Sequence, residues 1–133
     1  MAAPLKVAIL DTSVETIETL VWVLEQEGYA TSSAMIVDFK RGADLGAFLT
    51  KHDPAVIVYD VALPYEENWR YYVDVVKRHE AARGRCFILT TTNVAALEKL
   101  VGRTGAIELV GKPFDLETIV DAVEKAARAC GAL

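Results

Sequence analysis

The stretch Ala55-Val56-Ile57-Val58-Tyr59-Asp60 decides the fold of this 133-residue chain. Its five apolar residues, rich in Val, predict a strand that is buried on both faces of a parallel sheet. The carboxylate of Asp60 would then emerge at the carboxyl edge of the sheet, where open α/β folds bind their ligands. We therefore expect Asp60 to lie in a functional site.

Three other short apolar runs also lead into polar residues. Val7-Ala8-Ile9-Leu10 is followed by Asp11, Phe87-Ile88-Leu89 by Thr90-Thr91-Thr92, and Ile107-Glu108-Leu109-Val110 by Gly111-Lys112-Pro113. If these runs are parallel strands, their ends meet at one edge of the sheet and bring carboxylate, hydroxyl and ammonium groups toward Asp60. The pattern predicts a single polar site at that edge.

The segments between these runs alternate with them as helices. The first helix, about 14–26, carries Ile17, Leu20, Val21 and Leu24 on one face and is stopped by Gly28. We expect a strand over 29–36, a polar loop over 37–43, and further helices after Asp44, over about 66–80, from Asn93 to Gly102 and from Asp115. Five strands and five helices in strict alternation predict an α/β fold, a doubly wound five-stranded parallel sheet, (βα)5, with helices on both faces.

The composition is that of one soluble globular domain over residues 1–133. The net charge of −5, without a basic stripe, argues against binding to nucleic acid or to an anionic membrane. No run approaches the roughly 20 apolar residues of a membrane span, and the first residues lack the form of a signal peptide, so we expect a cytoplasmic location. Cys86 and Cys130 are expected to be small core residues and not a disulfide framework.

Asp11 and Asp60 would together support phosphoryl chemistry. Two neighbouring carboxylates favour a hard divalent cation, and Lys112 could pair with a phosphoryl oxygen or with Asp60 itself. An Asp carboxylate is a competent nucleophile toward phosphorus and forms an acyl phosphate. Such transfer is catalysed mainly by positioning and by neutralising charge, for which Lys112 and the hydroxyl of Thr91 are suited.

The ordered set of motifs resembles the receiver domains of two-component response regulators, the family of the single-domain chemotaxis regulator. The motifs are Val7-Ala8-Ile9-Leu10-Asp11, Ile57-Val58-Tyr59-Asp60 with Pro64, Thr91, and Lys112-Pro113-Phe114. The similarity spans essentially the whole chain from Lys6 to the last helix. It implies the flavodoxin-like form of the sheet and a signalling domain, not an enzyme beyond its own phosphorylation and dephosphorylation.

The resemblance also assigns roles to individual residues. By it, Asp60 is the phosphoacceptor, Thr91 the switch hydroxyl, and Lys112 the lysine that contacts the phosphoryl group. The ligands of a bound Mg²⁺ would be Asp11, Asp60 and the backbone carbonyl of Ala62. The family often has the bond before the proline cis, and the pair Lys112-Pro113 is compatible with this because X–Pro bonds adopt cis at low cost.

One departure from the family pattern concerns the metal. The family usually has two adjacent acidic residues after its first strand, and this chain has Asp11 followed by Thr12. A neutral hydroxyl is a poor substitute for a carboxylate ligand, so Mg²⁺ should bind weakly. Glu66 or Glu67 could reach back to supply the lost charge.

Other departures concern signalling. The turn after Pro64 reads Tyr65-Glu66-Glu67-Asn68-Trp69 in place of the usual turn that ends in Asp-Gly. Leu109 stands where the family often has an aromatic that turns inward on phosphorylation. The stretch from Gly28 to Asp60 is a few residues longer than in compact members, and we expect the extra residues in the 37–43 loop.

Two functions of different classes are open. In the first, Asp60 accepts a phosphoryl group from a histidine kinase or phosphotransfer protein and signals to a downstream protein partner or through a homodimer, since no output domain is expected. In the second, favoured by Thr12 and Leu109, the chain is a phosphorylation-independent receiver-like interaction module. A third reading, a small-molecule binder, lacks a glycine-rich phosphate loop after the first strand.

Trp22 is the one large apolar side chain expected off the apolar stripe of the first helix. It lies on the side of Glu15, Glu18 and Glu25. It either folds against the surface or contacts a partner protein, because exposed aromatic residues are enriched at interfaces.

Overall fold

The computed structural model describes residues 3–101, 108–113 and 115–132. The strands are β1 (Lys6–Asp11), β2 (Ala30–Met35), β3 (Val56–Asp60), β4 (Cys86–Thr91) and β5 (Glu108–Gly111). The α-helices are α1 (Val14–Gln26), α2 (Ile36–Lys40), α3 (Leu45–His52), α4 (Tyr65–Tyr71), α5 (Val94–Val101) and α6 (Leu116–Ala129). A π-helical segment over Tyr72–Lys77 continues α4, and a 3-10 turn covers Glu80–Ala82.

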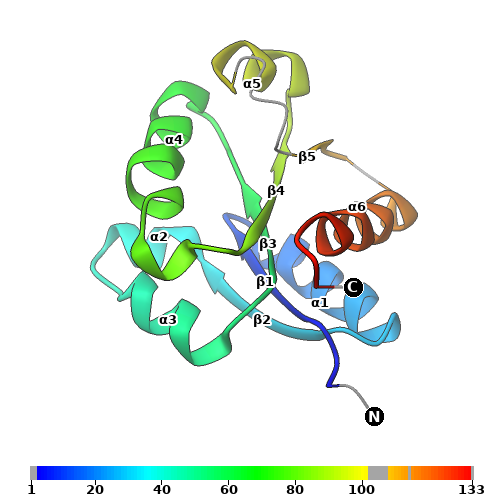
Figure 1. Cartoon of the computed structure of the whole chain (residues 1–133). Helices are drawn as coiled ribbons and strands as arrows, with labels where there is room; N and C mark the ends of the chain where they lie inside the picture. Colours follow the sequence, from blue (N-terminus) through cyan, green and yellow to red (C-terminus); the bar gives the residue numbers. More distant parts are fainter. Residues whose placement is uncertain (1–2, 102–107, 114, 133) are drawn as a thin grey trace.

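The five strands form one parallel sheet in the order β2-β1-β3-β4-β5. This is the predicted doubly wound sheet, with α1 and α6 on one face and the other helices on the opposite face (Figure 1). The strand order reverses between β1 and β3, which places a topological switch point at their carboxyl ends. Asp11 and Asp60 are the last residues of these two strands.

The sheet separates two apolar cores. Successive side chains of a strand point to opposite faces, so alternate residues of β1, β3 and β4 enter different cores. Val7, Ile9, Val56, Val58 and Ile88 pack with α1 and α6. Ala8, Leu10, Ile57, Tyr59 and Leu89 pack with α3, α5 and the π-helical segment. Burial on both faces explains why these strands appear in the sequence as continuous apolar runs.

The expected starts and stops of two helices are confirmed. The Ser13 hydroxyl accepts a hydrogen bond from the Thr16 N–H at 3.2 Å and caps α1, and Gly28 follows the helix with a φ of 91°. The Asp44 carboxylate accepts from the Ala47 N–H at 3.0 Å and caps α3. Trp22 is 61% exposed, so it does not fold against the surface.

One local expectation is wrong, and one expected helix is confirmed with a different geometry in its second half. The 37–43 segment is not simply a polar loop, because it begins as helix α2, fixed by the buried Ile36 and by an edge-to-face contact between Phe39 and Phe48. The described residues therefore contain six α-helices instead of five. The helix expected over 66–80 changes to π-helical geometry at Tyr72 and ends near Lys77.

The expectation that Cys86 and Cys130 are separate core residues is also wrong. They form a disulfide with a Cα–Cα distance of 6.1 Å, inside the usual range for such bonds. Cys86 begins β4 and Cys130 caps the end of α6, so the bond ties α6 to the amino edge of the sheet, opposite Asp60. Among the described residues, no helix is long and apolar enough to cross a membrane.

Candidate functional site at the carboxyl edge of the sheet

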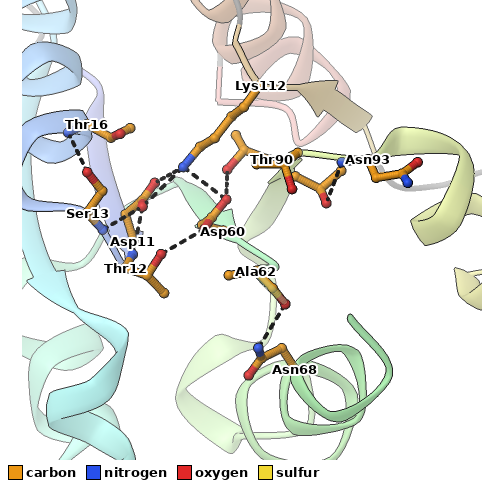
Figure 2. Close-up of polar contacts among 12 residues, drawn as sticks. Asp11, Thr12, Ser13, Thr16, Asp60, Ala62, Asn68, Thr90, Asn93 and Lys112 are labelled. Carbon is orange, nitrogen blue, oxygen red and sulfur yellow. Dashed lines mark hydrogen bonds and ion pairs between the residues drawn. The ribbon is translucent and has the colours of Figure 1, made fainter. Parts of the chain in front are cut away.

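Three residues expected in the site meet at the carboxyl edge of the sheet (Figure 2). Asp11 ends β1, Asp60 ends β3, and Lys112 directly follows β5. Asp11 is 1% exposed and Asp60 is 5% exposed, although both are ionisable. Buried carboxylates need partners, and the surrounding residues supply them.

Lys112 bridges the two carboxylates. Its Nζ lies 3.2 Å from Oδ1 and 3.1 Å from Oδ2 of Asp11, and 3.1 Å from Oδ1 of Asp60. Only 16% of its side chain is exposed, so water screens these ion pairs less than it screens surface pairs. The bond from Lys112 to Pro113 is cis, as the resemblance implied, and the bond from Leu63 to Pro64 is cis as well.

The hydroxyl that contacts Asp60 belongs to Thr90 and not to Thr91. The Thr90 Oγ1 donates to Oδ1 of Asp60 at 2.8 Å, and both groups are buried. Thr90 pairs with Asp60 in the β3–β4 register, so the two side chains leave the sheet on the same face. Thr91 is buried on the other face, and its hydroxyl accepts from the Asn93 N–H at 3.4 Å. The expected placement of Thr91 is thus wrong by one residue.

Strand alternation explains why these side chains converge. Asp11, Asp60 and Thr90 continue the alternate series of strand residues that packs against α1 and α6. Lys112 stands two residues after Val110, which belongs to the same core. The polar site is therefore the carboxyl end of that core, where the apolar series runs out at the sheet edge.

Thr12 also connects the two carboxylates. Its hydroxyl donates to Oδ2 of Asp60 at 3.1 Å, and its N–H donates to Oδ1 of Asp11 at 2.7 Å. The Ser13 N–H adds a third donor to Oδ1 of Asp11 at 3.0 Å. Every oxygen of the pair thus accepts at least one hydrogen bond, as buried carboxylates require.

The electrostatics of Asp11 reflect this crowding. Burial raises the pKa of Asp11, and the negative charge of Asp60 raises it further, while Lys112 and the Ser13 N–H oppose the rise. With both carboxylates ionised and Lys112 protonated, the three side chains carry a net charge of −1. The buried site formed by Asp11, Asp60 and Lys112 therefore carries one negative charge that these three side chains leave uncompensated.

Ala62, expected as a carbonyl ligand, has a partner on α4. Its carbonyl oxygen accepts from the Asn68 Nδ2 at 2.8 Å. Figure 2 shows this oxygen pointing toward Asn68 and away from the Asp11–Asp60 pair. The Asn68 Oδ1 in turn accepts from the Lys40 Nζ at 2.5 Å, which connects α2 to the loop after Asp60.

One further contact involves the loop that follows β4. The hydroxyls of Tyr65 and Thr92 form a short hydrogen bond that joins the start of α4 to the β4–α5 loop. A cavity of about 380 Å³ opens beside them, lined by α1, Thr92, Lys112 and Pro113. This cavity leaves room for a small group beside Lys112.

The residues present do not fit a divalent cation as they are arranged. Among the described residues, no cluster of three or more His, Cys, Asp or Glu side chains is placed to hold a metal ion. Two of the three expected ligands, Asp11 and Asp60, already share the Lys112 ammonium, and the carbonyl of Ala62 is turned to Asn68. Glu66 is paired with Arg70 at 3.3 Å on the surface of α4.

Comparison with protein families, curated proteins and solved structures gives a match only among the solved structures. No protein-family model matches the chain, and no curated protein matches it. Chemotaxis protein CheY4 of Vibrio cholerae has a similar structure, with a TM-score of 0.69 and 23% identity over 93% of this chain and 99% of that chain. The chain has the fold of a response-regulator receiver domain.

Two other solved structures extend the likeness. The signal receiver domain of a putative Luxo repressor protein from Vibrio parahaemolyticus has a TM-score of 0.67 and 16% identity, over 97% of this chain and 94% of that one. NtrX from Brucella abortus has a TM-score of 0.75 and 17% identity, and the match covers 97% of this chain but 28% of NtrX. At these identities the likeness shows the receiver fold, and the chemistry has to be argued from the site itself.

Sequence reasoning missed three contributors to the site. The Thr-Thr-Thr run contains no signal that fixes the β3–β4 register, and the register is what selects Thr90. Thr12 was seen only as a lost acid, although a hydroxyl beside a carboxylate is also a donor. Asn68 was noted only as part of an unusual turn. The features around Gly102, Ile107 and Phe114 lie outside the described residues.

Proposed function

We propose that the protein is an atypical receiver domain that accepts a phosphoryl group on Asp60 and signals through protein–protein contacts. The observation that carries this proposal is the environment of Oδ1 of Asp60, which forms an ion pair with the Lys112 ammonium and accepts a hydrogen bond from the Thr90 hydroxyl. A buried carboxylate flanked by a cation and a hydroxyl donor, at the switch point of the sheet, is suited to phosphoryl transfer.

The transfer needs a donor with a good leaving group, such as a phosphohistidine. A carboxylate oxygen of Asp60 attacks phosphorus and forms a P–O bond, while the P–N bond breaks. The electron pair stays on the imidazole nitrogen, and a ring protonated at its other nitrogen leaves as neutral histidine. Lys112 neutralises the phosphoryl oxygens, and Thr90 donates to one of them, from positions about 3 Å from the present carboxylate oxygen.

The signal would follow from the changed charge. Phosphorylation replaces one carboxylate charge by a phosphoryl group with more charge and more acceptor oxygens. Lys112 and Thr90 would follow the phosphoryl oxygens and release Asp11 and the β4–α5 loop. The donor would be a histidine kinase or phosphotransfer protein, and the output a protein partner or a second copy of the chain.

The test is intact mass after incubation with acetyl phosphate or phosphoramidate. We expect an increase of one phosphoryl group in the unmodified protein and none in Asp60→Asn, which keeps the size of the side chain. Asp53→Asn, at an exposed carboxylate that pairs with Arg85, is the matched control and should still gain the group. Failure of folded protein to gain the group from small donors and from a phosphorylated phosphotransfer protein would refute the proposal.

A second candidate function rests on the other oxygen of Asp60. Thr12 already satisfies Oδ2, and Leu109 is half-buried where an aromatic side chain would report phosphorylation. Both features favour a phosphorylation-independent interaction module. In that case Asp60→Asn would leave the affinity for the partner protein unchanged, whereas a phosphoryl switch requires the affinity to respond to an intact Asp60.

A further inference from the structure

The strongest unexplained feature of the site is that two residues, Lys112 and Thr12, each bridge its two carboxylates. Lys112 supplies a charged bridge through Nζ, and Thr12 supplies a neutral bridge through its hydroxyl and its N–H. We propose that this pocket is built to work without a divalent cation, with Thr12 as the residue that positions Asp60 in place of a metal. For phosphoryl uptake the inference rests on the proposed function, and for cation binding it does not.

The charge of the pocket is the first argument. Asp11 and Asp60 contribute two negative charges, and Lys112 returns one positive charge at 3.1–3.2 Å. A divalent cation placed between the carboxylates would give the cluster a net charge of +1. The cation would also be repelled by the Lys112 ammonium. Like charges at such separations repel strongly where burial weakens screening. A third carboxylate at position 12 would cancel this excess positive charge, but the side chain of Thr12 is neutral.

The direction of the Thr12 hydroxyl is the second argument. It donates to Oδ2 of Asp60, which is the oxygen of that carboxylate not already shared by Lys112 and Thr90. A cation at Oδ2 would have to break this hydrogen bond, and Thr12 could offer the cation only its neutral hydroxyl oxygen as a ligand. Hard cations such as Mg²⁺ depend on anionic oxygen ligands for affinity, so the exchange is unfavourable.

The Ala62 carbonyl is the third argument. Its oxygen points to Asn68, away from the carboxylates, and accepts from the amide at 2.8 Å (Figure 2). Asn68 is itself held by Lys40, whose ammonium also lies 4.9 Å from the centre of the Tyr71 ring. Turning the carbonyl toward a cation would therefore break a chain of contacts that runs from α2 through α4.

The direct test is calorimetric titration with MgCl₂ of the unmodified protein and of Thr12→Asp. We expect Thr12→Asp to bind Mg²⁺ at least about tenfold more tightly, because affinity follows the number of anionic ligands. Thr50→Asp, at an exposed site on α3, adds the same charge away from the pocket and should bind no better than the unmodified protein. Equal affinity of the unmodified protein and Thr12→Asp would overturn the inference.

A second variant protects the test if Thr12→Asp does not fold. Asn68→Ala frees the Ala62 carbonyl and leaves the carboxylates unchanged. We expect it to bind Mg²⁺ more tightly than the unmodified protein, by a smaller factor than Thr12→Asp because a carbonyl is a neutral ligand. Affinity that is unchanged or lower in Asn68→Ala would contradict the role given to Asn68, and tight binding by the unmodified protein would overturn the inference as a whole.

Phosphoryl uptake provides an independent readout. With phosphoramidate as donor, the rate of phosphoryl uptake by the unmodified protein should differ by less than about twofold between excess MgCl₂ and excess chelator. The reason is that Lys112 already neutralises charge at the Asp60 carboxylate and Thr12 already positions it. Thr12→Asp should become dependent on MgCl₂. Uptake that chelator abolishes in the unmodified protein would overturn the inference. No uptake in either condition would instead refute the proposed function, and the calorimetry would still decide the question of the cation.

Discussion

The two oxygens of Asp60 have different surroundings. Oδ1 forms an ion pair with Lys112 and accepts a hydrogen bond from Thr90, the two groups that the proposed phosphoryl transfer would use. Oδ2 accepts a hydrogen bond from Thr12, and the carbonyl of Ala62, which the resemblance implies as a metal ligand, accepts one from Asn68. Because different residues surround the two oxygens, the proposed phosphoryl chemistry and the proposed independence from a cation can be tested separately.

Lys112 should carry the largest energetic effect because it is shared by both sides. Lys112→Met keeps most of the apolar stem but leaves two buried carboxylates without their cation. Removing one partner of a buried pair typically costs about 3–5 kcal/mol. We expect a loss of this size in the free energy of unfolding at pH 7, measured by urea denaturation. Lys112→Arg keeps the charge and should lose much less, and a loss below about 1 kcal/mol in Lys112→Met would contradict the bridging role.

The same variant has a defined pH dependence. The pKa of Asp11 is already raised by burial and by Asp60, and loss of Lys112 removes a group that lowers it. An acid whose pKa is higher in the folded state than in the unfolded state stabilises the fold when protonated, and this stabilisation is lost as pH rises through the folded-state pKa. Lys112→Met should therefore recover stability as pH falls from 7 toward the raised pKa of Asp11, more than the unmodified protein does.

The disulfide offers a control at the opposite edge of the sheet. Cys86 and Cys130 are 44 residues apart, and closing a loop of that length stabilises a protein by about 2–4 kcal/mol. Reduction, or the paired change Cys86→Ala and Cys130→Ala, should lower the unfolding free energy by this amount and leave phosphoryl uptake unchanged. A thermal melt with and without reductant measures the first, and intact mass the second. Loss of uptake in folded, reduced protein would show that the two edges are coupled.

A comparison of Thr90 with Thr91 separates the contribution of the Thr90 contact with Oδ1 of Asp60 from the general effect of removing a threonine hydroxyl. Thr90→Val keeps the shape and removes a donor to a charged oxygen, so we expect a cost of about 1.5–3 kcal/mol and slower phosphoryl uptake. Thr91→Val removes a longer contact with the Asn93 N–H and should cost less and leave uptake unchanged. Urea denaturation and the time course of intact mass measure both. Equal effects of the two variants would contradict the assignment of Thr90.

These threonines also show how far the sequence could lead. The apolar runs placed Asp11, Asp60 and Lys112 at one edge, because strand ends in a parallel sheet are determined by local patterns. The choice between Thr90 and Thr91 depended on register, a relation between two strands that neither strand encodes alone. Roles taken from the resemblance, above all phosphorylation of Asp60, stay predictions.

The remaining differences have the same physical origin. Helix α2 depends on the contact of Phe39 with Phe48, and the disulfide depends on α6 returning to the start of β4. The Asn68 amide reaches the Ala62 carbonyl only because α4 begins directly after the loop. Each of these is a contact between segments whose separation in space was unknown from composition and periodicity.

The smallest expected effect concerns the hydrogen bond between Tyr65 and Thr92. Tyr65→Phe removes the hydroxyl that pairs with Thr92 and keeps the ring, so the start of α4 and the β4–α5 loop lose one link. A neutral, partly exposed hydrogen bond contributes about 0.5 kcal/mol, which corresponds to a change of roughly twofold in a rate.

We expect the phosphorylated Tyr65→Phe protein to lose its phosphoryl group to water about twofold faster, because looser loops admit water more often. Decay of the adduct after removal of the donor, followed by intact mass, measures the rate. Tyr71→Phe, whose ring lies under Lys40, is the matched control and should decay at the rate of the unmodified protein. Slower decay in Tyr65→Phe would contradict this prediction and would mean that the Tyr65 hydroxyl helps to position the attacking water.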